Sequence, residues 1–203
     1  MPPAAAVVLA YLVGSIPAAY IAGKAFRGID LREHGSGNLG ATNVLRVMGP
    51  KVGVLVLLFD AAKGAAPALI LPALTGVEPR GWWAVAYGSA AVLGHVRPIF
   101  LLLRGGGKGV ATAAGMFFAL VWLPTLVALV IWIAVLLASG YVSLASLAAA
   151  VTLPVAVLLV FGAREPAFAV SAVMAVFVFW THRANIGRLR RGEEHRFGRK
   201  TTA

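Results

Sequence analysis

The sequence predicts an all-α integral membrane protein with seven transmembrane helices, the N-terminus outside and the C-terminus inside. Three observations predict this fold class. Sixty per cent of the residues are hydrophobic and only 12% are charged, with a mean hydropathy of +0.88, whereas soluble domains carry roughly 25% charged residues. The apolar residues form long runs, several of them close to the ~20 residues that a membrane-spanning helix needs. The Lys and Arg residues concentrate in alternate loops between these runs, as the positive-inside rule requires.

The apolar runs give the expected spans in order. We expect helices near residues 4–23, 52–74, 82–94 or a little beyond, 110–122, 124–138, 143–161 and 167–180. The continuous run from 110 to 138 is too long for one comfortable span and too short for two full ones. Pro124 lies within it and favours a tight turn between two short helices, with a single kinked helix as the alternative. No signal-peptide pattern precedes the first span, so we expect it to be retained and residues 1–203 to form a single membrane domain.

Loop charge supports the number seven and sets the orientation. With seven spans, fifteen of the eighteen Lys and Arg residues lie on one side, including Arg199 and Lys200 in the tail. Arg80 and Arg164 lie on the other side, and Lys63 lies within a span. Six spans would place the tail opposite the first basic loops and remove this bias. We therefore expect the basic side to face the cytoplasm, with the site in its short amphipathic or irregular loops.

The first of these inner loops is rich in glycines and amides and reads Gly35-Ser-Gly-Asn-Leu-Gly-Ala-Thr-Asn-Val-Leu-Arg46. Its glycines allow tight turns that bring backbone N–H groups close to a ligand. Arg46 provides a planar cation that suits bidentate phosphate binding. We therefore expect the loop to bind an anion. Further neutral donors come from Ser36, Asn38, Thr42 and Asn43.

A second inner loop, Arg104-Gly-Gly-Gly-Lys-Gly109, lies directly before a predicted helix. Its backbone N–H groups and the helix N-terminus can point at an anion while Lys108 adds a full charge. The pattern is not that of a nucleotide-binding P-loop, because Leu102 replaces the first glycine and Gly109 replaces the Ser or Thr. A flexible, positively charged loop at the membrane edge is the alternative interpretation.

The third inner segment follows the last span. It contains His182 and Asn185, which share a face if the helix continues, and a polar pair next to an apolar run needs a partner. The arginines that follow favour contact with anionic headgroups, and we expect Glu194 to pair with one of them. Within a span, Asp60 and Lys63 lie three residues apart. We interpret them as a structural ion pair, with a place on a substrate path as the alternative.

The remaining composition excludes several chemistries. The chain has no cysteine, and so no disulfide, thiolate metal ligand or thioester nucleophile. Asp30 and Asp60 are the only aspartates and the carboxylates do not cluster, so we expect no catalytic metal and no cofactor. The net charge of +11 would suggest nucleic acid in a soluble protein. In so apolar a chain it indicates anionic lipid and phosphorylated substrates, and no nucleic acid.

Three motifs resemble those of the PlsY family, bacterial integral-membrane acyltransferases. They are Gly35-Ser-Gly-Asn-x-Gly-Ala-Thr-Asn-x-x-Arg46, Gly94-His-x-x-Pro98 with Gly105-Gly-Gly-Lys-Gly109, and Thr181-His-Arg-x-Asn185-Ile-x-Arg-Leu. The resemblance covers nearly the whole chain, including Gly14-Ser-Ile-Pro17 of the first span. One small departure is Arg104, which stands where a lysine is common and preserves the charge. The family implies a seven-span fold in the bacterial inner membrane, with a site that faces the cytoplasm.

The resemblance also implies an activity. The family moves a fatty acyl group from acyl phosphate to glycerol 3-phosphate, giving 1-acylglycerol 3-phosphate in the first step of phospholipid synthesis. Acyl-CoA and acyl carrier protein are not its direct donors. Membrane lipid is a further expected partner, and a soluble enzyme that forms acyl phosphate could dock on the inner loops. The resemblance places Ser36 in the active site and His182 and Asn185 at the reacting end. The phosphate-binding residues expected are Arg46, Lys108, Gly105, Gly106, Gly107, Gly109, Asn38, Thr42, Asn43 and Arg104.

The reaction needs little covalent help from the protein. Acyl phosphate already has a good leaving group, so positioning and charge stabilisation can supply most of the acceleration. Because no cysteine is present and no acid completes a triad with Ser36 or His182, we expect direct attack by the glycerol hydroxyl. The base is either His182 or a phosphate oxygen of the donor. The rival class is a transporter or receptor for a small phosphorylated solute, which would be expected to show broken or polar helices near the midplane.

Overall fold

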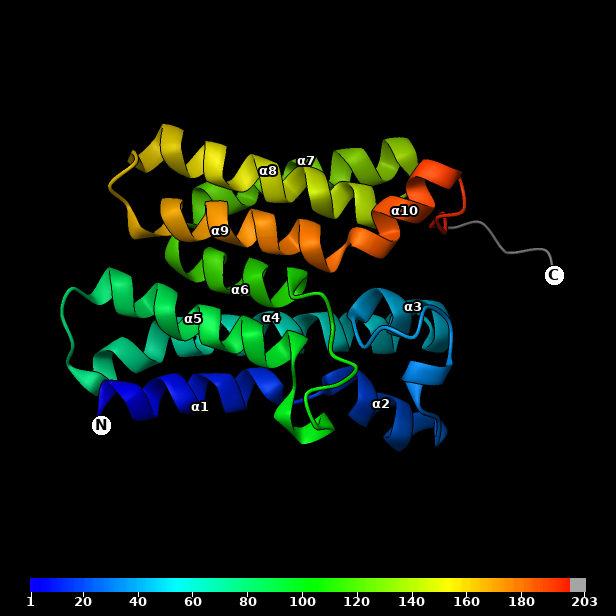
Figure 1. Ribbon diagram of the computed structural model, residues 1–203, viewed down its shortest axis with the longest axis horizontal. Coiled ribbons are helices and arrows are strands. Elements are labelled where there is room, and N and C mark those ends of the chain that lie inside the picture. Colours follow the sequence, from blue (N-terminus) through cyan, green and yellow to red (C-terminus); the bar gives the residue numbers. More distant parts are fainter. Residues whose placement is uncertain (198–203) are drawn as a thin grey trace. The chain divides into compact units, whose positions relative to one another are not determined.

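The computed structural model describes residues 1–197, and within that range the regular structure is entirely helical (Figure 1). This confirms the predicted all-α class. The chain forms two compact units, Met1–Leu120 and Val121–Ala203. Arg199 and Lys200, counted above in the basic tail, lie outside the described residues. The first unit contains α1 (Pro3–Ser15), α2 (Ala18–Arg27), η1 (Leu31–Glu33), α3 (Ala41–Met48), α4 (Pro50–Thr75), α5 (Arg80–Val96), η2 (Ile99–Leu101) and α6 (Val110–Leu120). The second contains α7 (Trp122–Ser139), α8 (Val142–Phe161), α9 (Pro166–Thr181) and α10 (Arg183–Arg191).

Five helical segments in the described part of the chain are long and apolar enough to cross a membrane. The bent pair α9 and α10 would make a sixth if it counts as one span. Helix α6 is apolar but has only 11 residues, which at 1.5 Å per residue reach about half of a ~30 Å hydrocarbon core. The number seven and the orientation therefore stay predictions. The five segments are Pro3–Arg27, Pro50–Thr75, Arg80–Leu101, Trp122–Ser139 and Val142–Phe161.

The first span is broken in the middle, which the sequence analysis did not anticipate. α1 ends at Ser15 and α2 begins at Ala18. Pro17 has no N–H to donate, and it keeps Ile16 out of the helical region at φ −59° and ψ 113°. The carbonyl of Ile16 is therefore outside the helical ladder, and the Nζ of Lys63 donates to it at 2.9 Å.

The run from 110 to 138 forms two helices, as predicted, and not one kinked helix. The break lies at Val121, with φ −141° and ψ 66°, so α6 ends at Leu120 and α7 begins at Trp122. Pro124 falls in the first turn of α7, where its missing N–H leaves no helical hydrogen bond unmade.

Glycines let the helices of the first unit approach one another closely. A Cβ atom added to Gly14 would lie 2.0 Å from the carbonyl oxygen of Ala91. A Cβ on Gly64 would lie 1.9 Å from the carbonyl oxygen of Thr112, and a Cβ on Gly115 would meet the neighbouring helix at the same distance. Small residues at such crossings are how helices gain contact in lipid, where the hydrophobic effect between them is weak.

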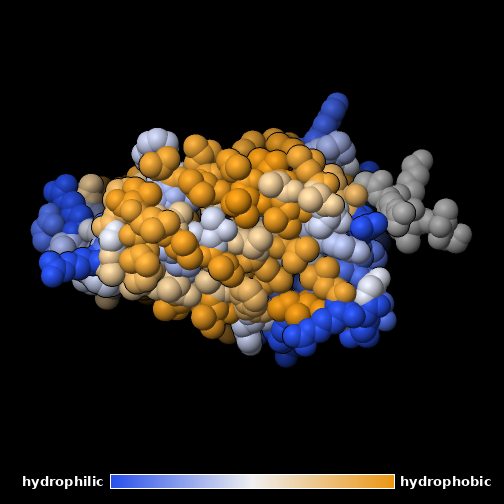
Figure 2. All heavy atoms as spheres, turned by 90° about the horizontal axis from the view of Figure 1, so that it is seen from above, coloured by the Kyte–Doolittle hydropathy of each residue, from blue (hydrophilic) through white to orange (hydrophobic). Residues whose placement is uncertain are grey.

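The outward surface is apolar. Large side chains such as Leu69, Leu137 and Leu159 are exposed on the long helices. On the face shown in Figure 2, hydrophobic residues cover most of the middle, and hydrophilic residues gather at the two ends. This is the distribution that a bilayer selects, because lipid tails take the place of a protein core around each span.

Candidate active site

The first glycine-rich loop is held in shape by Asn43, at the start of α3. The Asn43 side chain is buried, and its Oδ1 accepts a hydrogen bond from the backbone N–H of Ser36 at 2.8 Å. Its Nδ2 donates to the carbonyl oxygens of His34 at 3.0 Å and Leu31 at 3.3 Å. Gly35 adopts φ 63°, and a Cβ there would lie 2.3 Å from the amide oxygen. The loop therefore wraps tightly around one amide, and Ser36 remains on the exposed side.

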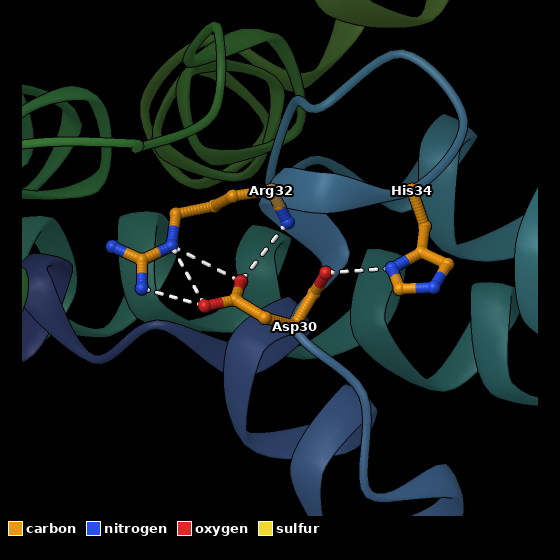
Figure 3. Close-up of polar contacts among 3 residues, drawn as sticks. All are labelled: Asp30, Arg32 and His34. Carbon is orange, nitrogen blue, oxygen red and sulfur yellow. Dashed lines mark hydrogen bonds and ion pairs between the residues drawn. The ribbon is translucent and has the colours of Figure 1, made fainter.

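An acidic and basic pair lies just before this loop (Figure 3). Arg32 Nη2 donates to Asp30 Oδ2 at 2.6 Å, and Arg32 Nε donates to Oδ1 at 3.0 Å. The Arg32 hydrogen bond lowers the pKa of Asp30 to about 2. His34 Nδ1 lies 2.9 Å from the carbonyl oxygen of Asp30, so it must carry the hydrogen there, because a carbonyl only accepts. Sequence reasoning missed this cluster; its only signal was the Asp-x-Arg spacing.

The second glycine-rich loop rests on the end of α5 and joins the first loop. The backbone N–H of Gly107 donates to the carbonyl of His95 at 3.2 Å. Asn38 Nδ2 donates to the carbonyl of Gly106, also at 3.2 Å. Lys108 follows half-buried, and α6 begins two residues later. The structure thus brings the Ser36 loop against the loop that carries Lys108, with the N-terminus of α6 beside them.

In the second unit the chain bends by 57° between α9 and α10, at the third motif. His182 is the residue at the bend and is only 3% exposed. Its Nδ1 lies 2.8 Å from the carbonyl oxygen of Val178, so Nδ1 carries the hydrogen and Nε2 is the acceptor of the neutral ring. Asn185 is also buried, in the first turn of α10.

Glu194 connects α10 to the start of α8. Its carboxylate accepts hydrogen bonds from Asn185 Nδ2 at 2.5 Å, Ser143 Oγ at 2.8 Å and Arg188 Nε at 2.6 Å. The expected pairing of Glu194 with an arginine is confirmed. Burial alone would raise the pKa of this carboxyl group, but the hydrogen bonds from Asn185, Ser143 and Arg188 outweigh it and hold the pKa below its ordinary value. The contact to Asn185 was not predicted, because it joins residues on either side of a turn.

A buried polar group lies inside the first unit. Lys63 Nζ is 2.8 Å from Asp60 Oδ1, and the two side chains are 3% and 2% exposed, so the predicted ion pair is confirmed. The same carboxylate oxygen lies 3.4 Å from His95 Nδ1. Through Lys63 the pair also reaches the carbonyl of Ile16, which accepts a second hydrogen bond from the backbone N–H of Ala18 at 3.1 Å. His95 was visible only as part of the second motif, and sequence reasoning gave it no role.

The predicted site residues fall into two sets. In the first unit the hydrogen bond from Asn38 to the carbonyl of Gly106 joins the two segments on which the residues proposed to bind phosphate lie. His182 and Asn185 lie in the second unit, on either side of the α9–α10 bend. Whether the two sets act in one pocket stays a prediction. The first set comprises Ser36, Asn38, Thr42, Asn43, Arg46, Arg104, Gly105, Gly106, Gly107, Lys108 and Gly109.

Comparison with known proteins decides the family. The family model for glycerol-3-phosphate acyltransferase matches residues 4–192, which include all three motifs. The chain belongs to the glycerol-3-phosphate acyltransferase family. A glycerol-3-phosphate acyltransferase of Myxococcus xanthus is 47% identical over 193 residues, covering 95% of this chain and 98% of that protein. One of Aquifex aeolicus is 43% identical over 193 residues, covering 94% and 97%.

Solved structures agree with this family. The crystal structure of PlsY, an integral membrane glycerol 3-phosphate acyltransferase, in its glycerol 3-phosphate form has a TM-score of 0.88 and 40% sequence identity. It covers 97% of this chain and 96% of that one. The lysophosphatidic acid form of PlsY gives a TM-score of 0.86 and 41% identity, with 97% and 95% covered. The resemblance to the PlsY family is confirmed, and with it an integral membrane acyltransferase of phospholipid synthesis.

Proposed function

We propose that this glycerol-3-phosphate acyltransferase uses acyl phosphate as its donor. The sn-1 hydroxyl of glycerol 3-phosphate attacks the acyl carbonyl, the new ester bond forms, and the acyl–phosphate bond breaks to release orthophosphate. The hydroxyl proton passes to the base or to the departing phosphate. The product is 1-acylglycerol 3-phosphate (lysophosphatidic acid), in the first step of phospholipid synthesis. The names of the two solved forms of PlsY support the acceptor and the product.

One contact carries this proposal. The hydrogen bond from Asn38 Nδ2 to the carbonyl of Gly106 joins the Ser36 loop to the Lys108 loop within one compact unit. Two phosphate groups must be bound in this reaction, and the joined loops offer many backbone N–H groups, a helix N-terminus and full positive charges for them. A flexible basic loop at the membrane edge would have no need of this contact.

Arg46 and Lys108 hold substrate phosphate in this proposal, with Asn38, Thr42, Arg104 and the four glycines of residues 105–109 around it. Arg46 is suited to two parallel hydrogen bonds, whereas Lys108 acts as a point charge. Asn43, also predicted to bind phosphate, has a structural part as well. Its side chain accepts from the N–H of Ser36 and donates to the carbonyls of His34 and Leu31, so it shapes the loop that presents Ser36.

Ser36 and Asn185 orient the reacting groups, and the attack proceeds without a covalent acyl-enzyme. The phosphate can leave as an anion, because the cations and N–H groups of the loops stabilise its negative charge. The base is His182, through Nε2, or a phosphate oxygen of the donor. The Nδ1 hydrogen that His182 gives to Val178 is compatible with the first choice.

We further propose seven spans in one membrane domain, with the N-terminus outside and the site facing the cytoplasm of a bacterial inner membrane. Helix α6 and the bent α9–α10 pair complete the count beyond the five long segments. A soluble enzyme that supplies acyl phosphate would meet the protein at this inner face.

The test is the release of orthophosphate by the purified protein in detergent. With palmitoyl phosphate and glycerol 3-phosphate present, we expect phosphate and lysophosphatidic acid in equal amounts, and no product when palmitoyl-CoA replaces the acyl phosphate. Ser36→Ala should abolish nearly all turnover and leave the thermal unfolding curve unchanged. A transporter would release no phosphate in detergent, and full activity of Ser36→Ala would remove this residue from the site.

A further inference from the structure

We propose that His95 is a positioning residue. Its ring, held by the buried Asp60–Lys63 pair, supports Gly107 and so gives the 105–109 loop the shape that binds substrate phosphate. This inference rests on the proposed function of that loop. Asp60, Lys63 and His95 would then form one chain of buried polar side chains, which extends from between the helices to the backbone of the 105–109 loop.

The ring of His95 lies directly beneath Gly107. A Cβ atom on Gly107 would lie 2.0 Å from His95 Nε2 and 2.6 Å from Cε1, which is closer than any real contact. The backbone of Gly107 is tied to the same residue, because its N–H donates to the His95 carbonyl at 3.2 Å. His95 is only 6% exposed, so no other position is open to the ring without movement of its neighbours.

The orientation of the ring is set from its other edge. His95 Nδ1 lies 3.4 Å from Asp60 Oδ1, and a carboxylate oxygen only accepts, so Nδ1 carries the hydrogen. This places Nε2 and Cε1, the far edge of the ring, against Gly107. A carboxylate that orients an imidazole through one nitrogen, so that the other edge can act, is a recurrent arrangement in proteins.

Asp60 is itself held from two sides. Lys63 Nζ lies 2.8 Å from the same Oδ1 and also donates to the Ile16 carbonyl at 2.9 Å, at the break between α1 and α2. The three residues thus link α4, α5 and the broken first span. A charged pair inside a span is costly to bury, and support of a functional loop gives it a use beyond mutual neutralisation.

Two neighbouring glycines provide a matched test. Gly106 and Gly107 both lack the left-handed backbone that Gly105 and Gly109 adopt, so alanine is allowed by the backbone at both. A Cβ on Gly107 would meet the His95 side chain, whereas a Cβ on Gly106 would meet the main-chain carbonyls of Val96 and His95 at 2.3 and 2.5 Å. Shortening the His95 side chain can therefore relieve the first clash but not the second.

The experiment is a double-mutant cycle on purified, active protein. Gly107→Ala and Gly106→Ala are each made alone and in a His95→Asn background, because asparagine keeps an N–H for Asp60 but lacks the far edge of the ring. KM for glycerol 3-phosphate, KM for palmitoyl phosphate, kcat and inhibition by inorganic phosphate are measured. We expect each glycine variant alone to raise at least one KM by about tenfold or more while kcat changes less.

In the His95→Asn background we expect Gly107→Ala to raise that KM by about threefold or less, and Gly106→Ala to keep its full effect. His95→Gln, whose amide reaches towards Gly107, should give no relief. Equal effects of Gly107→Ala in both backgrounds would overturn the proposal, as would a fall in kcat with every KM unchanged. An inactive wild-type protein would refute the proposed function instead, so the two failures are distinguishable.

Discussion

The amide oxygen of Asn43 accepts the backbone N–H of Ser36 at 2.8 Å, seven residues earlier in the chain. Together with the two bonds from its Nδ2, this makes one buried side chain the centre around which the proposed catalytic loop turns. The position of Ser36 is therefore decided from α3 and not by the loop alone.

Asn43→Ala should lower both stability and turnover. It leaves the buried carbonyl of Leu31 without this partner, at a cost of about 1–3 kcal/mol, and it removes the bonds to the part-buried backbone of His34 and Ser36, which frees the loop that presents Ser36. Asn43→Asp should be no better, because its carboxylate would face the carbonyl oxygens of Leu31 and His34. Thermal unfolding and phosphate release measure the two effects. Asn38→Ala, which gives up a single hydrogen bond to Gly106, serves as the control and should cost less stability. An Asn43→Asp protein as stable as the wild type would contradict this account.

Glu194→Gln should destabilise the second unit in a pH-dependent way. Because folding lowers the pKa of Glu194 from its ordinary value of 4.5, the stabilisation is fully present above that value. It is lost as the pH falls through the folded-state pKa. We expect the variant to be about 1–3 kcal/mol less stable at pH 7, and the difference to shrink on acidification below 4.5.

The neighbouring residue supplies the control for that measurement. Glu193 pairs with Arg191 at 2.7 Å, but both side chains are more than half exposed, so Glu193→Gln should change stability little. If the two variants behaved alike in thermal unfolding across the pH range, the buried Glu194 carboxylate would not stabilise the second unit more than an exposed one does.

Lys63→Met should be strongly destabilising, by about 3–5 kcal/mol, because it leaves the buried Asp60 carboxylate without its cation. Adding Asp60→Asn should recover much of this loss, since the second change removes the unpaired charge. The readout is thermal unfolding of the two variants in the same detergent. A double variant that is less stable than Lys63→Met would show that the pair is held for some reason other than neutralisation.

His182→Gln distinguishes the two candidate bases. We expect the donor phosphate to take the proton, because the His182 ring is only 3% exposed. Removal of a general base lowers kcat by roughly 100-fold or more. If the donor phosphate is the base, the loss in kcat for His182→Gln should be smaller than this, and the pH profile of kcat should be unchanged. A larger loss in kcat, together with the disappearance of the ionisation of a base from the pH profile, would show that His182 is the base.

The natural absence of cysteine allows a direct test of orientation. Single cysteines that replace Glu78 and Arg190 should be accessible from opposite sides of the membrane in intact cells. We expect an impermeant maleimide to reach Glu78→Cys from outside, and to reach Arg190→Cys only after the membrane is permeabilised. The reverse pattern would place the N-terminus inside. Labelling of both residues from one side would rule out an odd number of spans between Glu78 and the tail, where the seven-span topology has five.

The helical class and most helices could be predicted, because apolar composition and span length are local properties of the sequence. The division of the run from 110 to 138 into two helices was predicted because Pro124 lies within an over-long apolar run, and the break lies at Val121. The break at Pro17 was missed, although proline was its signal, because the run of hydropathy continues through it. The predicted span at 110–122 is the one that helix length does not support, because α6 has only 11 residues.

The residues of the site were predicted by pattern, but their partners were not. Asn43 was expected to bind phosphate, and nothing in the loop's sequence indicated that its amide turns inward. His95 and Asp60 are separated by 35 positions, and only the packing of α4 against α5 brings them together. Glycine-rich spacing reveals where a backbone can approach a ligand, whereas the side chains that hold this backbone depend on tertiary contacts.

The glycine crossings of the first unit carry a consequence for how this chain can vary. At Gly14, Gly64 and Gly115 main chain meets main chain, and no rotamer change can make room for an added methyl group. The outward leucines and valines face only fluid hydrocarbon and can be exchanged for one another. Substitutions that adapt the protein to thicker or stiffer bilayers can therefore occur on the outer faces of these helices. The distance between the helix axes cannot change without breaking the contacts at these glycines.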